Sequence, residues 1–493
     1  MTSTAGKTWT RSLALASALL CGLPAQANEA GSAMPVSVLT GFESLKLPGR
    51  ERMGLAAAEV LFELRPGIWL GPVVYGAASG QRGGLFVLGA ELQQRWTLRP
   101  DLALLAGLAV GGGGGAGAPV GNGLMLRPSI SLLQDFGPLR AGLSVSAVQF
   151  PGTAIRSQQV GLVAQWQTDF RVQALGRVGE KVPAEQRSGL GFDQVALTHT
   201  QVRLRGAAQA MDFPLVGARA AQRLNDQGYL WGLSAAAAVR QDVAGYMEIL
   251  GFVGRELSLG ERLRLGARAS LGLGGGGGVP TGGGLMARLE GTLSAKLAPG
   301  WEAGASFGRI QGPAPGLRGH VTELWLAADL EPAALPSTPG RSGTVVRTEW
   351  AGSLQQMFDV ARRDGSKPSI QTLGLILNRW LTPELYASAQ AHSAYGGQAG
   401  AYSVGLIGAG WASTSLPAPW QVGAELLVGG AGGAGVQGVS GAITQGLIWA
   451  GLAPVGSAQQ WRLGLGRAAS LRGGGSSPVA SLTWAVAFGQ VGR

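Results

Sequence analysis

Three glycine tracts constrain the fold of this chain more than any other feature. The first is Leu108-Ala-Val-Gly-Gly-Gly-Gly-Gly115 and the second is Leu271-Gly-Leu-Gly-Gly-Gly-Gly-Gly278. Each is followed by a Gly-Leu-Met-x-Arg motif, at Gly123–Arg127 and at Gly284–Arg288. A third, looser copy begins at Leu426. The shared order of tract and motif indicates an internal repeat, which has to be recognised before any single element is assigned.

The spacing of these copies sets the size of the repeat. Matching segments flank each tract and place three repeats at residues 28–195, 196–340 and 341–493. Units of about 150 residues are far longer than the repeats of solenoids or propeller blades, so each unit must contain several strands. We therefore expect one multi-strand block that occurs three times.

The N-terminal segment predicts export. A basic stretch precedes an apolar run from Leu13 to Leu23, and Pro24–Ala27 supplies a small-x-small cleavage site. This pattern predicts a secretory signal peptide over residues 1–27. The only cysteine, Cys21, lies inside that segment. The exported protein is therefore expected to lack thiols, which excludes disulfides and cysteine-based metal or catalytic sites.

Strands explain the apolar stretches better than membrane helices do. Residues 102–126 are uncharged, but every glycine in a helix interior costs about 1 kcal/mol relative to alanine. In Arg262–Leu273, arginines occupy positions 262, 264 and 268, whereas leucines occupy 263, 265, 271 and 273. This alternation is typical of a strand with one polar and one apolar face. A helical inner-membrane protein, with the glycines as helix-packing faces, is the alternative.

The predicted fold class is all-β. Alternating runs recur between turn clusters up to the last one, Ser481–Phe488, and about 20 residues for each strand with its connection give roughly 22–24 strands. We predict one large antiparallel transmembrane β-barrel built from the three repeats. Three smaller eight-stranded units satisfy the same arithmetic and are the alternative. One helix is predicted, from Ser353 to Asp364.

The glycine tracts themselves are expected to be strand segments without side chains. Such segments permit sharp curvature or the close approach of another backbone. We hypothesise that the three tracts meet in one region of the folded protein. A phosphate-loop role is not expected, because no Gly-Lys-Ser/Thr follows any tract.

The signal peptide, the alternating strands and the aromatic-ended final strand resemble Gram-negative outer-membrane β-barrel proteins as a class. The resemblance implies a location in the cell outer membrane, in contact with its lipid and lipopolysaccharide. A periplasmic or secreted protein is the alternative. Tryptophans near the predicted strand ends would mark the membrane interfaces, namely Trp69, Trp96, Trp231, Trp301, Trp411 and Trp461.

The basic residues suggest a lumen that favours anions. Removal of the signal peptide lowers the net charge from +11 to +9. An arginine on a lipid face costs about 2–4 kcal/mol near the midplane, so arginines within strands should point into a lumen or lie at its ends. The alternative is pairing with acids such as Glu248, Glu290 and Glu323. The candidate lumen residues are Arg262, Arg264, Arg268, Arg288 and Arg309.

The predicted function is a porin-like channel that passes small anionic solutes or an exported polysaccharide. The alternative is a structural or assembly protein of the envelope surface without transport. No enzyme activity, cofactor, metal or nucleic-acid partner is expected. Ser306 lies in a Gly-x-Ser-x-Gly sequence, but no helix follows it as a hydrolase elbow requires. His199, His320 and His392 show no metal-ligand spacing.

Overall fold

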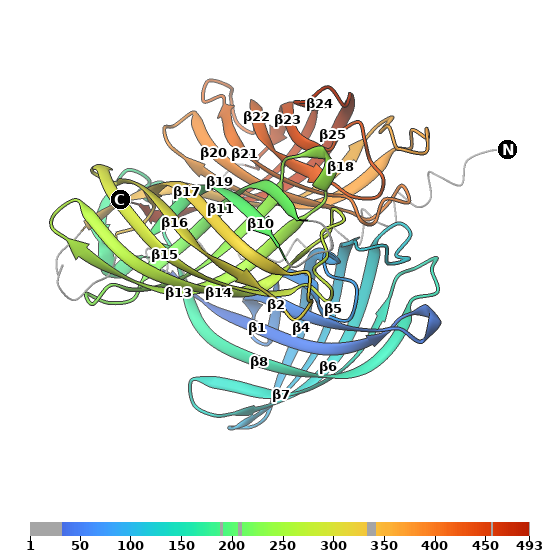
Figure 1. Ribbon diagram of the computed structural model, residues 1–493. Coiled ribbons are helices and arrows are strands. Elements are labelled where there is room, and N and C mark those ends of the chain that lie inside the picture. The colour runs from blue at the N-terminus through green and yellow to red at the C-terminus, as the bar shows by residue number, and fades with distance from the viewer. Residues whose placement is uncertain (1–31, 188–190, 206–209, 333–341, 455–456, 493) are drawn as a thin grey trace.

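The chain folds into three antiparallel eight-stranded β-barrels that follow one another along the sequence and pack together (Figure 1). The computed structural model describes residues 32–187, 191–205, 210–332, 342–454 and 457–492. The predicted signal peptide lies outside these ranges. Within them, no helix is long and apolar enough to cross a membrane.

The strands run up and down in chain order. The first barrel consists of β1 (Ser32–Lys46), β2 (Arg52–Arg65), β3 (Ile68–Ser79), β4 (Phe86–Arg99), β5 (Leu102–Gly114), β6 (Leu124–Asp135), β7 (Leu139–Gln149) and β8 (Arg156–Val172). The second consists of β10 (Gln194–Leu204), β11 (Met211–Arg223), β12 (Tyr229–Ala238), β13 (Met247–Leu259), β14 (Leu263–Gly275), β15 (Leu285–Ala298), β16 (Trp301–Gln311) and β17 (Arg318–Asp329). The third consists of β18 (Ser342–Met357), β19 (Ile370–Trp380), β20 (Leu385–Ala394), β21 (Ser403–Ala412), β22 (Trp420–Gly432), β23 (Gly441–Leu452), β24 (Gln459–Ser470) and β25 (Ser476–Gly492).

Four short 3₁₀ helices and one short strand lie between these elements. The helices are η1 (Pro48–Arg50), η2 (Leu175–Arg177), η3 (Ala184–Gln186) and η4 (Gln241–Val243). The strand β9 (Lys181–Pro183) belongs to the link between the first two barrels and pairs with the start of β18.

In each barrel the first strand pairs with the eighth, which closes the sheet on itself. The all-β prediction and the alternative of three eight-stranded units are confirmed, and the single large barrel is wrong. The reason lies in the inward positions, many of which hold large apolar side chains such as Leu55, Tyr75 and Val87. These side chains can bury one another only in a barrel narrow enough for its interior to be filled.

The predicted helix over Ser353–Asp364 is also wrong. Residues 353–357 continue β18, and the rest of the segment is a connection without helix. Gln355 and Met357 point inward and Met357 pairs with Val479 of β25. The apolar spacing that suggested a helix also fits a period of two, and pairing with β25 and β19 decided between them.

Each barrel has a turn end and a loop end. At the turn end lie tight turns, such as that at Pro66-Gly67, and the links between barrels, whereas the loop end carries the connections that follow the first, third, fifth and seventh strands. Exposed tryptophans gather at the turn end, at Trp96, Trp301 and Trp411. Trp231 and Trp461 are half-buried there. Trp69 differs, because it points into the first barrel and is only 3% exposed.

The repeats occupy equivalent places in the three barrels. Every glycine tract ends the fifth strand, and in the first two barrels the motif after it opens the sixth. The connection after each third strand closes with the same backbone hydrogen bond, from the amide of Ala77, Ala238 or Ala394 to the carbonyl of Leu85, Tyr246 or Tyr402, at 2.9–3.0 Å. The repeated sequence therefore encodes a repeated barrel.

The glycines form the junctions between the barrels at the loop end. Gly83 donates its amide hydrogen to the Gly282 carbonyl at 2.6 Å, which joins the first barrel to the second. Gly400 donates to Gly121 at 3.1 Å, which joins the third to the first. A Cβ on Gly432 would lie within 3.0 Å of Gly245, at the junction of the third barrel with the second.

Each glycine tract takes part in one of these junctions, where it packs against backbone of a neighbouring barrel that lies outside that barrel's own tract. An added Cβ on Gly84 would lie within 3.0 Å of the Gly276 backbone, one on Gly245 within 3.0 Å of Gly433, and one on Gly114 within 3.0 Å of Gly400, in each case across a junction between two barrels. Side chains at these positions would force the barrels apart. The first and third barrels also touch at the turn end, where the ring centroids of Phe170 and Trp350 lie 5.0 Å apart.

Candidate functional site: the barrel interiors

The interior of each barrel is filled by side chains in layers. At the loop end, inward-facing apolar residues form one closely packed cluster per barrel, with members at most 7% exposed. Tyr75, Tyr246 and Tyr402 are among the largest of these buried side chains. Next to this cluster, farther toward the turn end, lies a layer of charged and polar residues. In the first and third barrels a second apolar layer follows, around Trp69 and Trp449 respectively.

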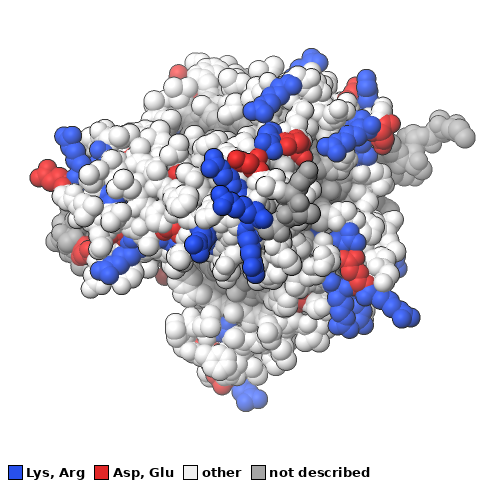
Figure 2. Space-filling view, in the orientation of Figure 1, with Lys and Arg blue, Asp and Glu red and all other residues white. Residues whose placement is uncertain are grey.

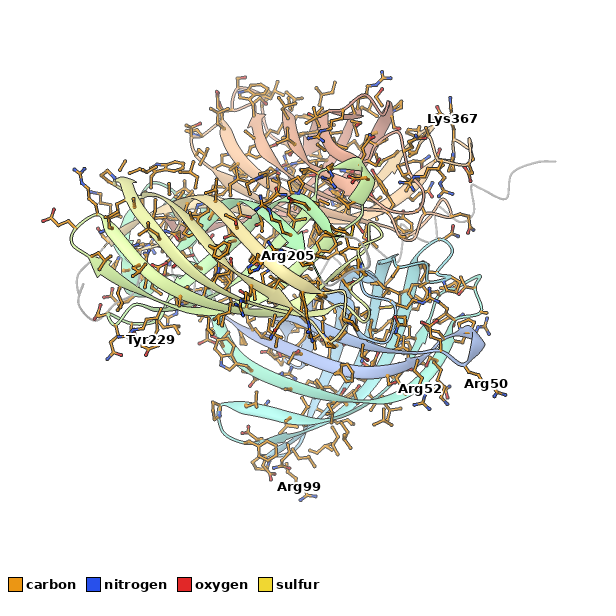
Figure 3. All side chains as sticks on the ribbon, in the orientation of Figure 1. Arg50, Arg52, Arg99, Arg205, Tyr229 and Lys367 are labelled. Atoms are coloured by element: carbon orange, nitrogen blue, oxygen red, sulfur yellow. The ribbon has the colours of Figure 1, made fainter. Side chains whose placement is uncertain are left out.

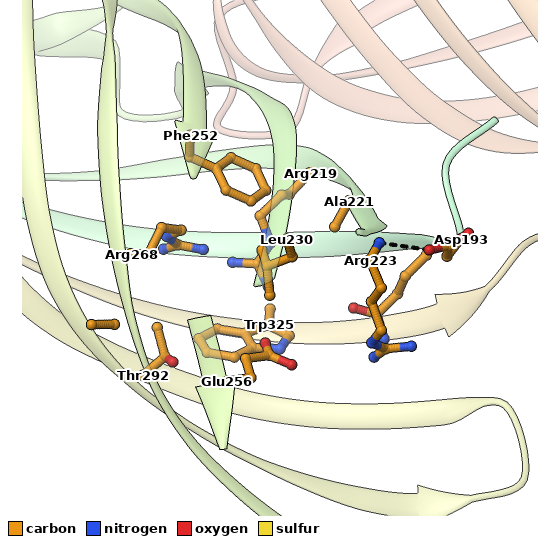
Figure 4. Close-up of a pocket in the computed structure, with 12 residues that line it drawn as sticks. Asp193, Arg219, Ala221, Arg223, Leu230, Phe252, Glu256, Arg268, Thr292 and Trp325 are labelled. Atoms are coloured by element: carbon orange, nitrogen blue, oxygen red, sulfur yellow. Dashed lines mark hydrogen bonds between the residues drawn. The ribbon is translucent and has the colours of Figure 1, made fainter. Parts of the chain in front are cut away.

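The charged layer of the second barrel is the most extensive. Arg268 bridges two carboxylates, with its guanidinium 3.0 Å from Glu290 and 2.9 Å from Glu323. Arg219 also pairs with Glu323, at 2.6 Å. The Ser306 hydroxyl donates to Glu290 at 2.7 Å. Figure 4 shows Arg219 and Arg268 pointing into the lumen near Trp325, whose ring lies 4.4 Å from the Arg219 guanidinium carbon.

A second pair lies nearer the loop end of the same barrel. Arg288 pairs with Glu248, which also accepts a hydrogen bond from the Tyr246 hydroxyl at 3.1 Å. Both charged side chains are 3% exposed. Paired in this way, the arginines leave little uncompensated positive charge in the lumen.

The other two barrels contain smaller versions of this layer. In the first, Arg127 binds both oxygens of Glu43, each at 3.0 Å. In the third, Glu349 accepts from Arg462 at 2.7 Å and from the Asn378 amide at 3.0 Å. Neither pair is among the candidate lumen residues predicted from the sequence. The alternation of side chains along each strand could have revealed them, since all of these residues occupy positions that face the lumen.

The space left in these interiors is small. A cavity of about 30 Å³ lies beside Arg219 and Arg268 in the second barrel, and one of about 20 Å³ lies beside Glu43 and Arg127 in the first. A water molecule needs roughly 10–15 Å³ of accessible cavity volume. Each cavity therefore has room for one or two waters.

Three of the five candidate lumen arginines point into the second barrel. Arg268 and Arg288 are buried there, and the half-buried Arg264 pairs with Glu302. Arg262 lies in the turn before β14, at the turn end and outside the lumen. The prediction that Arg309 points into the lumen is wrong, because its side chain faces outward on β16. It shares the parity of the exposed Phe307 two residues earlier, which the alternation could have revealed.

The residues considered for catalysis do not come together. Ser306 lies inside the second barrel, while His199 and His320 face outward and His392 is inside the third. In the part of the chain that the structure describes, no cluster of three or more His, Cys, Asp or Glu side chains could hold a metal ion.

Comparison with known proteins gives matches at the level of structure alone. No family model and no curated protein matches the sequence. The siderophore receptor PirA from Pseudomonas aeruginosa aligns over 93% of this chain and 81% of its own, at 10% identity and a TM-score of 0.27. The FrpB iron transporter from Neisseria meningitidis aligns over 96% and 83%, at 11% and 0.27. OpdK from P. aeruginosa, solved with vanillate, aligns over 93% and 99%, at 12% and 0.20. Scores this low do not establish a shared topology.

The fold and its surface define the class of protein. Antiparallel closed barrels with polar groups inside and apolar side chains outside are typical of transmembrane β-barrels. Strands of 10–17 residues are long enough to cross a bilayer, which takes about 9–11 residues. The chain is a β-barrel protein of the outer-membrane type, as the sequence resemblance implied.

Proposed function

We propose that this chain is an integral outer-membrane protein whose three sealed barrels form one membrane-embedded platform without an open pore. The observation that carries the proposal is the filling of the lumens by apolar clusters and paired charges. Eight strands enclose an interior that side chains alone can fill. The cavities of about 20–30 Å³ in the first and second barrels are too small for a solute larger than water.

The outer surface supports the membrane part of the proposal. Large apolar side chains are more than half exposed on the outward faces of all three barrels, as at Val160, Leu289 and Leu465. Much of the surface seen in Figure 2 carries no charge. Exposed apolar side chains on the outward faces of all three barrels match contact with lipid.

Conductance measurements test the sealed state. We expect protein reconstituted into planar bilayers to pass no steady current, and vesicles that contain it not to swell in isosmotic sugar solution. An authentic porin in the same bilayers is the positive control. Steady channel steps from correctly folded wild-type protein would contradict the proposal.

A narrow gated channel is the second candidate, and the charged layers favour it. An ion-pair network across a lumen could act as a gate that opens when its partners exchange. In that case, Arg268→Ala should produce or increase current through the second barrel. If the apolar cluster at the loop end seals the lumen independently, the Arg268→Ala variant should pass no current.

A further inference from the structure

Charge is unequally distributed between the two ends of the described barrels. At the turn end, on its connections, strand ends and links, surface acids balance bases. The bases are Arg65, Arg99, Arg140, Arg171, Arg177, Lys181, Arg255, Arg262 and Lys296, and the acids are Asp101, Asp135, Asp169, Glu180, Glu185, Asp226, Glu261, Asp329 and Glu384. The positive charge of the protein must therefore lie elsewhere.

At the loop end, bases greatly outnumber acids. The bases are Lys46, Arg50, Arg52, Arg82, Arg156, Arg203, Arg205, Arg240, Arg309, Arg318, Arg362, Arg363, Lys367, Arg467 and Arg472. The acids are Glu51, Asp212, Asp242, Asp359 and Asp364. This end thus carries the net positive charge of the described surface.

Some of these acids neutralise particular arginines. Glu51 pairs with Arg82 at 2.7 Å, and Asp242 pairs with Arg240 at 2.6 Å. The hydrogen bonds from these arginines hold the pKa of Glu51 and of Asp242 below the usual range, so both carboxylates stay ionised at neutral pH. Arginines elsewhere on the loop end remain available for an external anion.

One group of such arginines lies on the outer surface of the second barrel. Arg203, His320 and Arg309 are direct neighbours in register on β10, β17 and β16, and all three face outward. Arg205 and Arg318 lie next to this row, joined by a backbone hydrogen bond of 2.8 Å. We call these five residues the basic patch. Figure 2 shows blue side chains gathered in the middle of the view, where Figure 3 labels Arg205.

The basic patch borders the lipid-facing surface directly. Phe307, two residues before Arg309 on the same face, is 62% exposed, and its ring stacks on His320 at 5.7 Å. Leu324 and Leu326 continue the apolar face along β17 and are 56% and 44% exposed. Only Arg203 has an acidic partner among the described residues, Asp212 at 3.2 Å. Arginines at the edge of an apolar belt lie at the depth of lipid headgroups.

We propose that the basic patch binds the phosphate groups of multiply phosphorylated lipids in the leaflet at the loop end. Guanidinium groups bind phosphate through paired hydrogen bonds, and several at one site favour a multiply charged headgroup. The continuity of the patch with the apolar face favours a lipid over a soluble anionic polymer, which would have no use for that face. The inference rests on the proposed membrane embedding of the barrels.

Titration with lipid A tests the proposal. Folded protein in neutral detergent is titrated with bisphosphorylated lipid A and with the dephosphorylated form, and bound lipid is counted by native mass spectrometry. We expect tight binding of the bisphosphorylated form only. The variant R205Q/R309Q/R318Q should bind it of the order of 100-fold more weakly, at roughly 1 kcal/mol per cation near an anionic surface.

The matched control removes three cations from the opposite end of the same barrel. The variant R255Q/R262Q/K296Q has the same net charge as R205Q/R309Q/R318Q, but its changes lie much farther from the patch than the Debye length of about 8–10 Å, so its affinity should match that of the wild type. Equal losses in both variants would overturn the proposal, because binding would then follow net charge alone. Stronger binding of soluble alginate than of lipid A would overturn it in favour of a polymer. If folded wild-type protein in vesicles proves not to contact lipid, the membrane embedding fails rather than the phosphate site.

Discussion

Replacing Arg268 with alanine should destabilise the second barrel by about 3–5 kcal/mol. Arg268 is the shared partner of Glu290 and Glu323 in a layer where all three side chains are at most 7% exposed. Among the described residues, its removal leaves Glu290 with the Ser306 hydroxyl alone, and an unpaired charge in a dry interior is costly. Urea titration of reconstituted protein, with the folded fraction read from the mobility of unheated samples, measures the loss.

Two further variants separate charge burial from other effects. Arg262→Ala removes an exposed arginine from the turn before β14 and should change stability by less than about 0.5 kcal/mol. The double variant R268A/E290A should be less unstable than R268A, because it removes the uncompensated carboxylate together with its partner. Equal stability of R268A and R262A would contradict a buried ion-pair network of Arg268, Glu290 and Glu323.

Gly84→Ala should weaken the junction between the first two barrels by about 2–5 kcal/mol. Gly84 has a φ of 95°, which costs other residues roughly 1–2 kcal/mol. A Cβ there would also lie within 3.0 Å of the backbone of Gly275 and Gly276, and overpacking costs about 1–3 kcal/mol more. We expect a lower urea midpoint and faster hydrogen exchange of the Gly83 amide, which bonds to Gly282 across the junction.

Gly152 offers a matched control within the same barrel. Its φ is 80°, but a Cβ at this position would meet nothing within 4 Å. Gly152→Ala should therefore show the conformational cost alone, about 1–2 kcal/mol, without faster exchange at Gly83. If both variants behave alike, the glycine contacts do not hold the barrels together.

The local features of the fold could be predicted because a strand in a membrane barrel has a strict two-residue period. Arg264 and Arg268 alternate with Leu263 and Leu265 along β14, and this alternation correctly predicted that the arginines face inward and the leucines outward. Applied to β16, the same parity would have placed Arg309 outside with Phe307. The close approach of the glycine tracts to other backbones was also predictable, since residues without side chains suit such contacts.

The closure of the barrels could not be predicted in the same way. The pairing of β8 with β1, rather than with the first strand of the next repeat, leaves the alternation of both strands unchanged. The decisive information was the size of inward residues such as Tyr75 and Tyr246, which fill a narrow lumen. The basic patch was missed for a related reason, because its members come from three strands that only the closed sheet places side by side.

The most direct test of the account is whether lipid touches the outside of all three barrels. Single cysteines at Val160, Leu289 and Leu465, one in each barrel, carry a fluorescent label in vesicles made with or without brominated lipid. The predicted exported chain contains no other cysteine. We expect brominated lipid to quench the label at all three positions and aqueous iodide to have little effect. Quenching by iodide instead, in any one barrel, would contradict a protein of three membrane-embedded barrels.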